Sequence, residues 1–216
     1  MPFRSVPSNA SVATSQDGRL FSPSAQRNQG AICDLLQEIA PDTGYALEIA
    51  SGTGQHITRF AQAMGDLIWQ PSEIDPSRRI SIDAYAEETG LTNLKPTLIL
   101  DATHTEWSNS VPVQDLIVTI NLLHLISYPE MKMLIGESAK ALHETGTFFL
   151  YGPFKREGKL TSPGDEAFDQ SLREHDGEIG YKDVSEVVET AHIAGLSLSA
   201  EFEMTANNLA LVFRGS

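Results

Sequence analysis

The chain of 216 residues has one cysteine, Cys33, so it can form no internal disulfide and no metal site built from several cysteines. Basic residues are also scarce: 15 Lys and Arg stand against 29 Asp and Glu, and the formal net charge is −14. An acidic surface repels phosphate backbones. The composition therefore argues against nucleic acid as a partner.

Long hydrophobic runs are absent as well. No apolar segment approaches the roughly 20 residues that a membrane-spanning helix needs. The N-terminus shows no positively charged start followed by an apolar core, which is the mark of a secretory signal. No group of His, Cys and Asp has metal-ligand spacing. We therefore expect a soluble, cytoplasmic protein with no membrane partner and no bound metal.

What the sequence does contain is a regular alternation of elements after an irregular start. Residues 1–21 are mostly rich in Ser, Ala, Asn and Pro without any period, which predicts a flexible N-terminal arm. Residues 22–216 have the length of one domain with a sizeable core. The predicted helices cover 22–40, 55–64, 76–89, 129–142 and 182–194. The predicted strands cover 45–50, 67–71, 96–101, 115–121, 146–152, 196–204 and 208–214.

Such alternation predicts a parallel sheet with helices on both faces. The last two strands are joined by so short a connection that they can pair only antiparallel. The expected fold is thus α/β: a single Rossmann-like domain with a mostly parallel, seven-stranded sheet that ends in an antiparallel hairpin. Between the fifth strand and the last helix, residues 153–180 are expected to form a long polar loop with a short helix near 166–174.

The stretch "ALEIASGTGQH", residues 46–56, has the strand, glycine turn and helix of a nucleotide site. A phosphate-loop NTPase needs Gly-Lys-Ser/Thr, but Gln55 follows Gly54 here. A dinucleotide fold wants a third glycine where this chain has Ile57, so that fit is partial. S-adenosylmethionine, which has no pyrophosphate, needs only the close backbone approach that Gly52 and Gly54 permit.

Two acids strengthen the S-adenosylmethionine interpretation. Glu73 follows the second predicted strand, where a carboxylate can accept both ribose hydroxyls, and Asp75 is its rival. Asp101 follows the third, where a polar group can meet the adenine amine. Open parallel sheets bind ligands at the carboxyl ends of their strands. Each acid could instead be a helix cap or a solvated loop residue.

The order of elements resembles class I S-adenosylmethionine-dependent methyltransferases, whose seven-stranded sheet ends in an antiparallel hairpin. More closely, the chain resembles the methyltransferase-like protein 26 family. The matching segments are "SPSAQRNQGAI", "LEIASGTGQH", "WQPSEID", "NLLHL", "YGPF", "FDQSLR" and "ANNLALVFR", which span 22–214. Ala50 stands where the wider superfamily often has Gly, in agreement with the closer family. The resemblance implies S-adenosylmethionine as cofactor, or S-adenosylhomocysteine as product.

By analogy, Glu48 lies under the methionyl end of the cofactor, or is a strand acid bonded to backbone amides. Arg27 and Asn28 begin a helix that could fold over the cofactor, with Arg27 meeting its carboxylate or the substrate; alternatively, Arg27 is an exposed helix residue. The full cofactor-binding set expected is Arg27, Asn28, Glu48, Ala50, Gly52, Gly54, His56, Glu73, Asp101, Ala102 and Asn121.

The catalytic residues expected are His124 and Tyr151, and the acceptor would be bound by His124, Tyr151 and Phe154. Asn121 and His124 follow the fourth strand, at the rim beside the methyl donor, where His124 is either a general base or a packed structural residue. We expect methyl transfer to an oxygen or nitrogen of a small molecule. Two alternatives stay open: a non-methylating isomerisation or cyclisation with bound cofactor, or a non-catalytic cofactor-binding regulatory subunit. The sequence fits a monomer or a homodimer.

Overall fold

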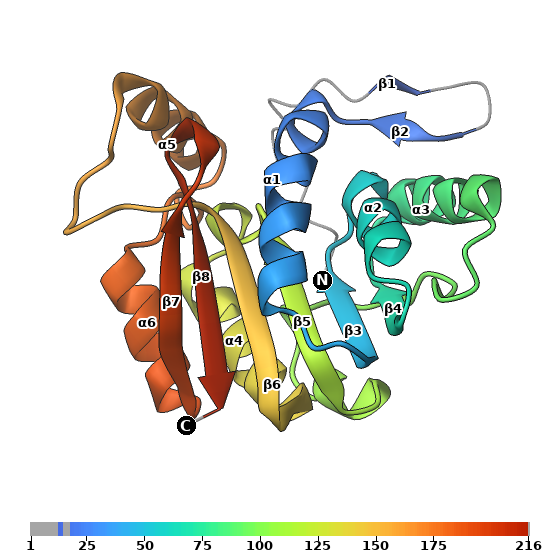
Figure 1. Ribbon diagram of the computed structural model, residues 1–216. Helices are drawn as coiled ribbons and strands as arrows, with labels where there is room; N and C mark the ends of the chain where they lie inside the picture. The colour runs from blue at the N-terminus through green and yellow to red at the C-terminus, as the bar shows by residue number, and fades with distance from the viewer. Residues whose placement is uncertain (1–12, 15–17, 216) are drawn as a thin grey trace.

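The computed structural model describes residues 13–14 and 18–215, and its centre is a six-stranded sheet in the order β4-β3-β5-β6-β8-β7 (Figure 1). Four strands are parallel: β3 (Gly44–Ile49), β4 (Leu67–Pro71), β5 (Gln114–Ile120) and β6 (Leu142–Pro153). The hairpin of β7 (Leu196–Glu203) and β8 (Asn208–Gly215) completes the sheet, and β8 runs antiparallel to both of its neighbours. The expected parallel sheet with a closing antiparallel hairpin is confirmed.

Helices cover both faces of the sheet, so the central strands β3, β5, β6 and β8 are largely buried on both sides, as their apolar sequences require. On one face lie α1 (Pro23–Ile39), α2 (Gln55–Ala63) and α3 (Pro76–Thr89). On the other lie α4 (Tyr128–Ala141) and α6 (Val184–Ile193). Alternate strand residues supply the two cores: Leu47 and Ile49 join the α4 and α6 side, whereas Ala46 joins the α1 side.

The helix boundaries follow local capping chemistry that the sequence already shows. Ser22 caps α1 by accepting the Ala25 N–H, and Asp75 caps α3 by accepting the Ser77 N–H. Ser127 and Asp183 each form a capping box at the start of α4 and α6. Short 3-10 turns occupy Trp107–Ser110, Leu123–Leu125 and Thr205–Asn207. Within the described part of the chain, no helix is both long and apolar enough to cross a membrane.

The predicted strand at 96–101 is wrong, and the sheet has six strands rather than seven. This segment and the residues just before it run beside β4, with only isolated bridges at Trp69–Leu94 and Ser72–Leu98. Pro96 has no N–H to give to a ladder, and its carbonyl is bound instead by the side chain of Gln70, at 2.8 Å. A proline at this point is tolerated because the segment lies outside β4, at the edge of the sheet.

The segment 153–180 is more ordered than a loop. It contains α5 (Pro163–His175), which includes the predicted helix at 166–174 and begins earlier, at the cap Ser162. α5 lies beyond the upper end of the sheet in Figure 1, at the carboxyl ends of the parallel strands. Its buried apolar side chain is Leu172, and the other buried residues of the helix, Asp165 and Asp169, are acidic. This polar composition is why the sequence predicts only part of the helix.

Most of the predicted arm, residues 1–12 and 15–17, lies outside the described residues. β1 (Ala13–Thr14) pairs antiparallel with β2 (Leu20–Phe21). Leu20 is held to α3 at both backbone groups: its N–H donates to Ser81 Oγ at 2.7 Å, and its carbonyl accepts from the Tyr85 hydroxyl at 3.2 Å. The proposed domain boundary at residue 22 stays a prediction.

One glycine fixes how closely α2 approaches α3. Gly54, the N-cap of α2, has φ 94°, and a Cβ there would lie 2.9 Å from the Cα of Ile82. We expect Gly54→Ala to lower the free energy of unfolding by about 1–2 kcal/mol from the left-handed backbone alone, with the contact adding to this. The control is Gly136→Ala in α4, where an added Cβ would have open space around it. This variant should be about 0.5–1 kcal/mol more stable than the parent. Urea unfolding compares the two, and equal stabilities would refute the close packing.

Candidate functional site

The glycine turn follows β3, and three of its residues have left-handed backbone conformations. Ala50, Gly52 and Gly54 have φ values of 55°, 60° and 94°. The turn is bound to the loop after β4, because Ser51 N–H donates to the Ser72 carbonyl at 2.9 Å and Ser72 N–H donates to the Glu48 carbonyl at 3.0 Å. A Cβ on Gly52 would approach the Ala50 carbonyl oxygen no closer than 3.9 Å. The backbone at Gly52 is therefore open to a ligand.

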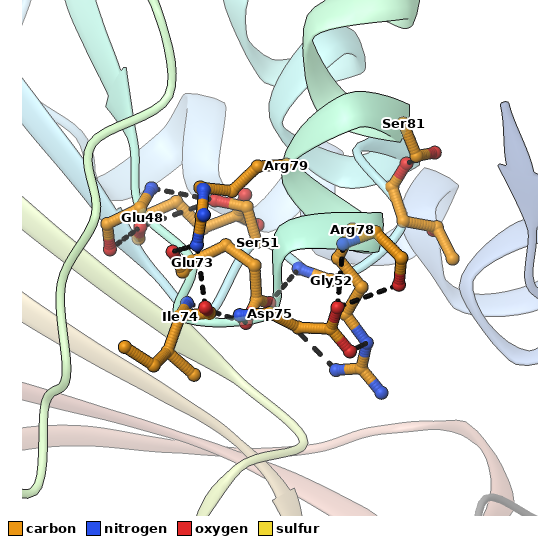
Figure 2. A network of polar contacts seen from close by, with 12 residues as sticks. Glu48, Ser51, Gly52, Glu73, Ile74, Asp75, Arg78, Arg79 and Ser81 are labelled. Atoms are coloured by element: carbon orange, nitrogen blue, oxygen red, sulfur yellow. Dashed lines mark hydrogen bonds and ion pairs between the residues drawn. The ribbon is translucent and has the colours of Figure 1, made fainter. Parts of the chain in front are cut away.

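Glu73 joins this turn to the next one. Its Oε2 accepts the Gly52 N–H at 3.1 Å, and its Oε1 accepts the N–H groups of Ile74 and Asp75 at 2.8 and 3.0 Å (Figure 2). The residue is only 2% exposed. A carboxylate has about four acceptor positions, so Oε2 keeps room for another donor. The rival, Asp75, is occupied as the cap of α3.

Glu48 lies behind the turn, also 2% exposed, and its Oε2 has no hydrogen-bond partner. Burial raises the pKa of this carboxyl to about 8, the Ser51 side chain opposes the shift, and the charge of Glu73 adds to it. A buried acceptor without a partner is costly, and a donor or a cation placed there would relieve that cost. This oxygen is the feature around the glycine turn that most directly indicates a ligand.

The third expected acid occupies a more open position. Asp101 Oδ1 accepts from the backbone and hydroxyl of Thr103 at 3.0 and 2.6 Å, and its side chain is 38% exposed. Its Oδ2 lies 3.5 Å from Nε2 of His104. Ala102 is buried in the core on the α4 side of the sheet. Asp101 thus has a turn-forming role that leaves part of its carboxylate exposed.

A polar chain connects α1, α2 and β6 on the α1 face. Asn28 Oδ1 lies 2.9 Å from Nε2 of His56, and burial lowers the pKa of His56 to about 4, so the ring is neutral at pH 7. Burial raises the pKa of Tyr151, and hydrogen bonds from three side chains, Asn28 among them, oppose the shift. The structure thus brings together Asn28, His56 and Tyr151. Arg27 is not part of this group of residues: it is exposed and donates to Ser24 Oγ at 3.1 Å.

His124 belongs to a different cluster. Asn121, with φ 54°, ends β5 and donates its N–H to the Tyr151 carbonyl at 2.8 Å. The His124 ring then packs against Phe168 and Tyr181, with centroids 5.6 and 6.1 Å away. Burial, with the charge of Lys182, lowers the pKa of His124 to about 3. His124 is thus a packed, neutral histidine.

Tyr151 and Phe154, both expected to line the acceptor pocket, lie in the cores on opposite faces of the sheet. They therefore cannot both meet an acceptor from the same face.

Sequence reasoning missed the residues that surround His124. Asp169 accepts the Tyr181 N–H at 2.6 Å and the Arg173 Nε at 2.8 Å. Lys182 donates to the carbonyls of Ile126 and Gly180 at 2.7 and 2.8 Å, and burial lowers its pKa to about 8. The polar, loop-like composition of 153–180 gave no sign of this burial. The one available signal was the helical spacing of Phe168 and Leu172.

A cleft of about 550 Å³ has the Tyr181–Lys182 segment in its lining. Its lining includes Tyr128, Lys155, Arg173, Tyr181, Lys182 and Glu186, none of which belongs to the glycine turn. Among the described residues, no group of His, Cys, Asp and Glu is arranged to hold a metal ion.

Comparison with known proteins gives a family and a fold. Residues 19–215 match the family model described as "Protein of unknown function (DUF938)". An O-methyltransferase family protein from Burkholderia thailandensis is 14% identical, with a TM-score of 0.76, over 89% of this chain and 57% of that one. An O-methyltransferase described as putative, from Nostoc punctiforme, is 19% identical with a TM-score of 0.77, over 88% and 56%. Human N-acetylserotonin methyltransferase, solved with S-adenosylmethionine, is 11% identical with a TM-score of 0.70, over 89% and 53%.

This chain spans a little over half of the length of these solved structures. At such identities the likeness shows the fold alone, and this chain shares that fold with these methyltransferase structures.

The raised pKa of Glu48 predicts a particular dependence of stability on pH. Between its ordinary value of 4.5 and about 8, the folded chain holds a proton that the unfolded chain has lost, so stability falls as pH rises through this window. Glu48→Gln removes this loss. We expect the variant to gain up to about 1.4 kcal/mol per pH unit relative to the parent between those limits, and to level off above them.

Thermal unfolding of parent and variant from pH 5 to pH 9 measures the difference. The exposed Glu201→Gln should follow the parent at every pH. Parallel curves for parent and Glu48→Gln would show that Glu48 ionises normally.

Proposed function

Since the chain belongs to the DUF938 family, whose description assigns no function, we propose a function from the geometry of its crevice. The chain binds S-adenosylmethionine and transfers its methyl group to an oxygen or nitrogen of a small molecule. The observation that carries this proposal is the pair of buried acids around an open glycine turn: Glu48 with an unpartnered oxygen, and Glu73 behind Gly52. That solved neighbours contain S-adenosylmethionine or S-adenosylhomocysteine supports the choice of ligand.

The residues present suit the parts of this cofactor. Glu73 Oε2 has room to accept from ribose hydroxyls, and the backbone at Gly52 allows their close approach. Glu48 provides a buried acceptor for a cationic group, and Asp101 provides a partly exposed carboxylate for the adenine amine. When bound, the cofactor supplies a methyl group on a sulfonium, which is ready for in-line displacement. The long motifs between residues 22 and 214 also lead us to propose a relationship to the methyltransferase-like protein 26 family.

On the acceptor side, we assign proton uptake to His124. Its ring is neutral at pH 7, which is the form a general base needs, but its pKa of about 3 makes it a weak base. Proton uptake therefore accompanies methyl transfer: as the hydroxyl or amine lone pair bonds to the methyl group, the proton on that oxygen or nitrogen becomes acidic and passes to the ring. The carboxylate of Asp169, which opposes the lowering of the His124 pKa, stabilises the imidazolium that forms. Phe168 and Tyr181 pack against the ring and make its surroundings apolar. Positioning of the acceptor contributes the rest, as in other displacement reactions between bound partners.

The first test is binding of the cofactor. Glu73→Gln replaces an acceptor oxygen by an NH2 group, which faces N–H donors, so we expect the affinity for S-adenosylmethionine to fall tenfold or more. Titration calorimetry measures this, with circular dichroism to show that the fold is kept and Glu201→Gln as the matched control. If Glu73→Gln binds as well as the parent, Glu73 is outside the site. If the parent itself does not bind, the cofactor is misassigned.

The second test is turnover, followed as S-adenosylhomocysteine formed in the presence of a panel of phenols, catechols and amines. We expect His124→Ala to lower the rate by about 10²–10⁴-fold, with the deficit shrinking as pH rises and the acceptor ionises by itself. Cofactor affinity should stay within about twofold, since the proposed contacts of Glu48, Glu73 and Asp101 lie on β3, on the loop after β4 and at the end of the edge segment.

His192→Ala, at an exposed position of α6, should change neither quantity. Full turnover in His124→Ala would assign catalysis to positioning alone. Binding without any methylated product across the panel would favour an isomerisation, a cyclisation or a regulatory role.

A further inference from the structure

The two acids of the crevice are equally buried but differ in their hydrogen bonds. Glu73 accepts three backbone N–H groups, which is the environment of an ionised carboxylate. Glu48 has an oxygen with no donor at all. Two negative charges side by side in a buried site oppose each other. The proton that one of them must hold therefore belongs on Glu48.

Within residues 18–215, the elements around Glu48 offer it no compensating charge. Its partners in the sheet are Pro71 on β4 and Val118 on β5. On the same face, α2 presents His56, whose ring is neutral, and the charged residues of α1 are all exposed.

Two cations of α3 lie beyond the loop after β4, and both are engaged there. Arg79 donates to the carbonyls of Glu73 and Ile74 at 3.4 and 2.6 Å. Arg78 lies 3.9 Å from carboxylate oxygens of Glu73 and Asp75. The remaining charged group that faces Glu48 is thus the carboxylate of Glu73 (Figure 2).

We propose that Glu48 carries a proton in the ligand-free chain and gives it up when a cationic group of the cofactor is seated beside it. This inference rests on the proposed function. The O–H bond of the carboxylic acid breaks, the proton passes to buffer, and the carboxylate that remains pairs with the cation. Binding then expels one proton per chain, and affinity rises about tenfold per pH unit up to about pH 8, where it levels off.

Two parts of the cofactor could be the cation. The ammonium is common to S-adenosylmethionine and S-adenosylhomocysteine, whereas the sulfonium is present only before methyl transfer. Proton release with both ligands assigns the ammonium. Release with S-adenosylmethionine alone assigns the sulfonium. A neutral thioether without the amino acid part, 5′-deoxy-5′-methylthioadenosine, should bind without release in either case.

The experiment is titration calorimetry of the parent at pH 7 in phosphate and in Tris, whose ionisation enthalpies differ. The dependence of the apparent binding enthalpy on buffer gives the number of protons released. We expect a value close to one for the parent and for Glu201→Gln. Glu48→Gln, which has no proton to lose, should give zero and an affinity that is flat between pH 6 and pH 8. Circular dichroism at each pH shows that the variant is folded.

A second measurement requires no ligand. A ¹³C-carboxyl titration of the parent, with Glu48 assigned by the loss of its signal in Glu48→Gln, should give a midpoint near 8. A midpoint near 4.5 would overturn the proposal, and so would cofactor binding without proton release, which would leave the cofactor assignment intact. Absence of binding would overturn the proposed function and the linkage together, whatever the titration shows.

Discussion

The candidate cofactor site depends on one carboxylate. Glu73 accepts N–H groups from the turn after β3 and from its own turn after β4, so two loops that start on different strands are fixed by a single side chain. Hydrogen bonds to a charged group are worth about 1.5–3 kcal/mol each, roughly twice those between neutral groups. The backbone of Glu73 is itself held by the edge segment, through its N–H to the Leu98 carbonyl at 3.0 Å. The turn after β3, the turn after β4 and the edge segment thus meet at this residue.

Much of this could be predicted from the sequence because the relevant signals are local. The helices predicted to begin at residues 22, 55 and 76 begin in the structure at Pro23, Gln55 and Pro76, because capping and the glycine turn act over a few residues. The short connection before Asn208 likewise allows only an antiparallel hairpin, as found. The strand at 96–101 could not be excluded in this way. Its apolar run is typical of a strand. Only the structure shows that the segment lies at the edge of the sheet, where the Pro96 carbonyl accepts from the Gln70 side chain and no continuous ladder forms.

The placement of the acceptor side could be predicted less well, since it depends on contacts between distant segments. Tyr151 and Phe154 are three residues apart, but the pleat of β6 and its exit send them into different cores. His124 meets Phe168 and Tyr181, which come more than 40 residues later in the chain. No local pattern states that Lys182 is buried against two carbonyl oxygens. The cofactor side of the crevice is built from neighbouring turns, and the acceptor side from long-range packing.

The position of β8 has a consequence for how the chain is made. β8 lies between β6 and β7, although both precede it in the sequence. During synthesis, β6 therefore presents an unpaired edge from residue 153 until residues 208–215 have emerged, and β7 has no neighbour in the sheet until then. An open edge rich in Phe and Leu is the kind of surface on which nascent chains associate. The sheet can therefore be completed only late in synthesis, when β8 pairs with β6 and β7, because more than fifty residues separate the end of β6 from the start of β8.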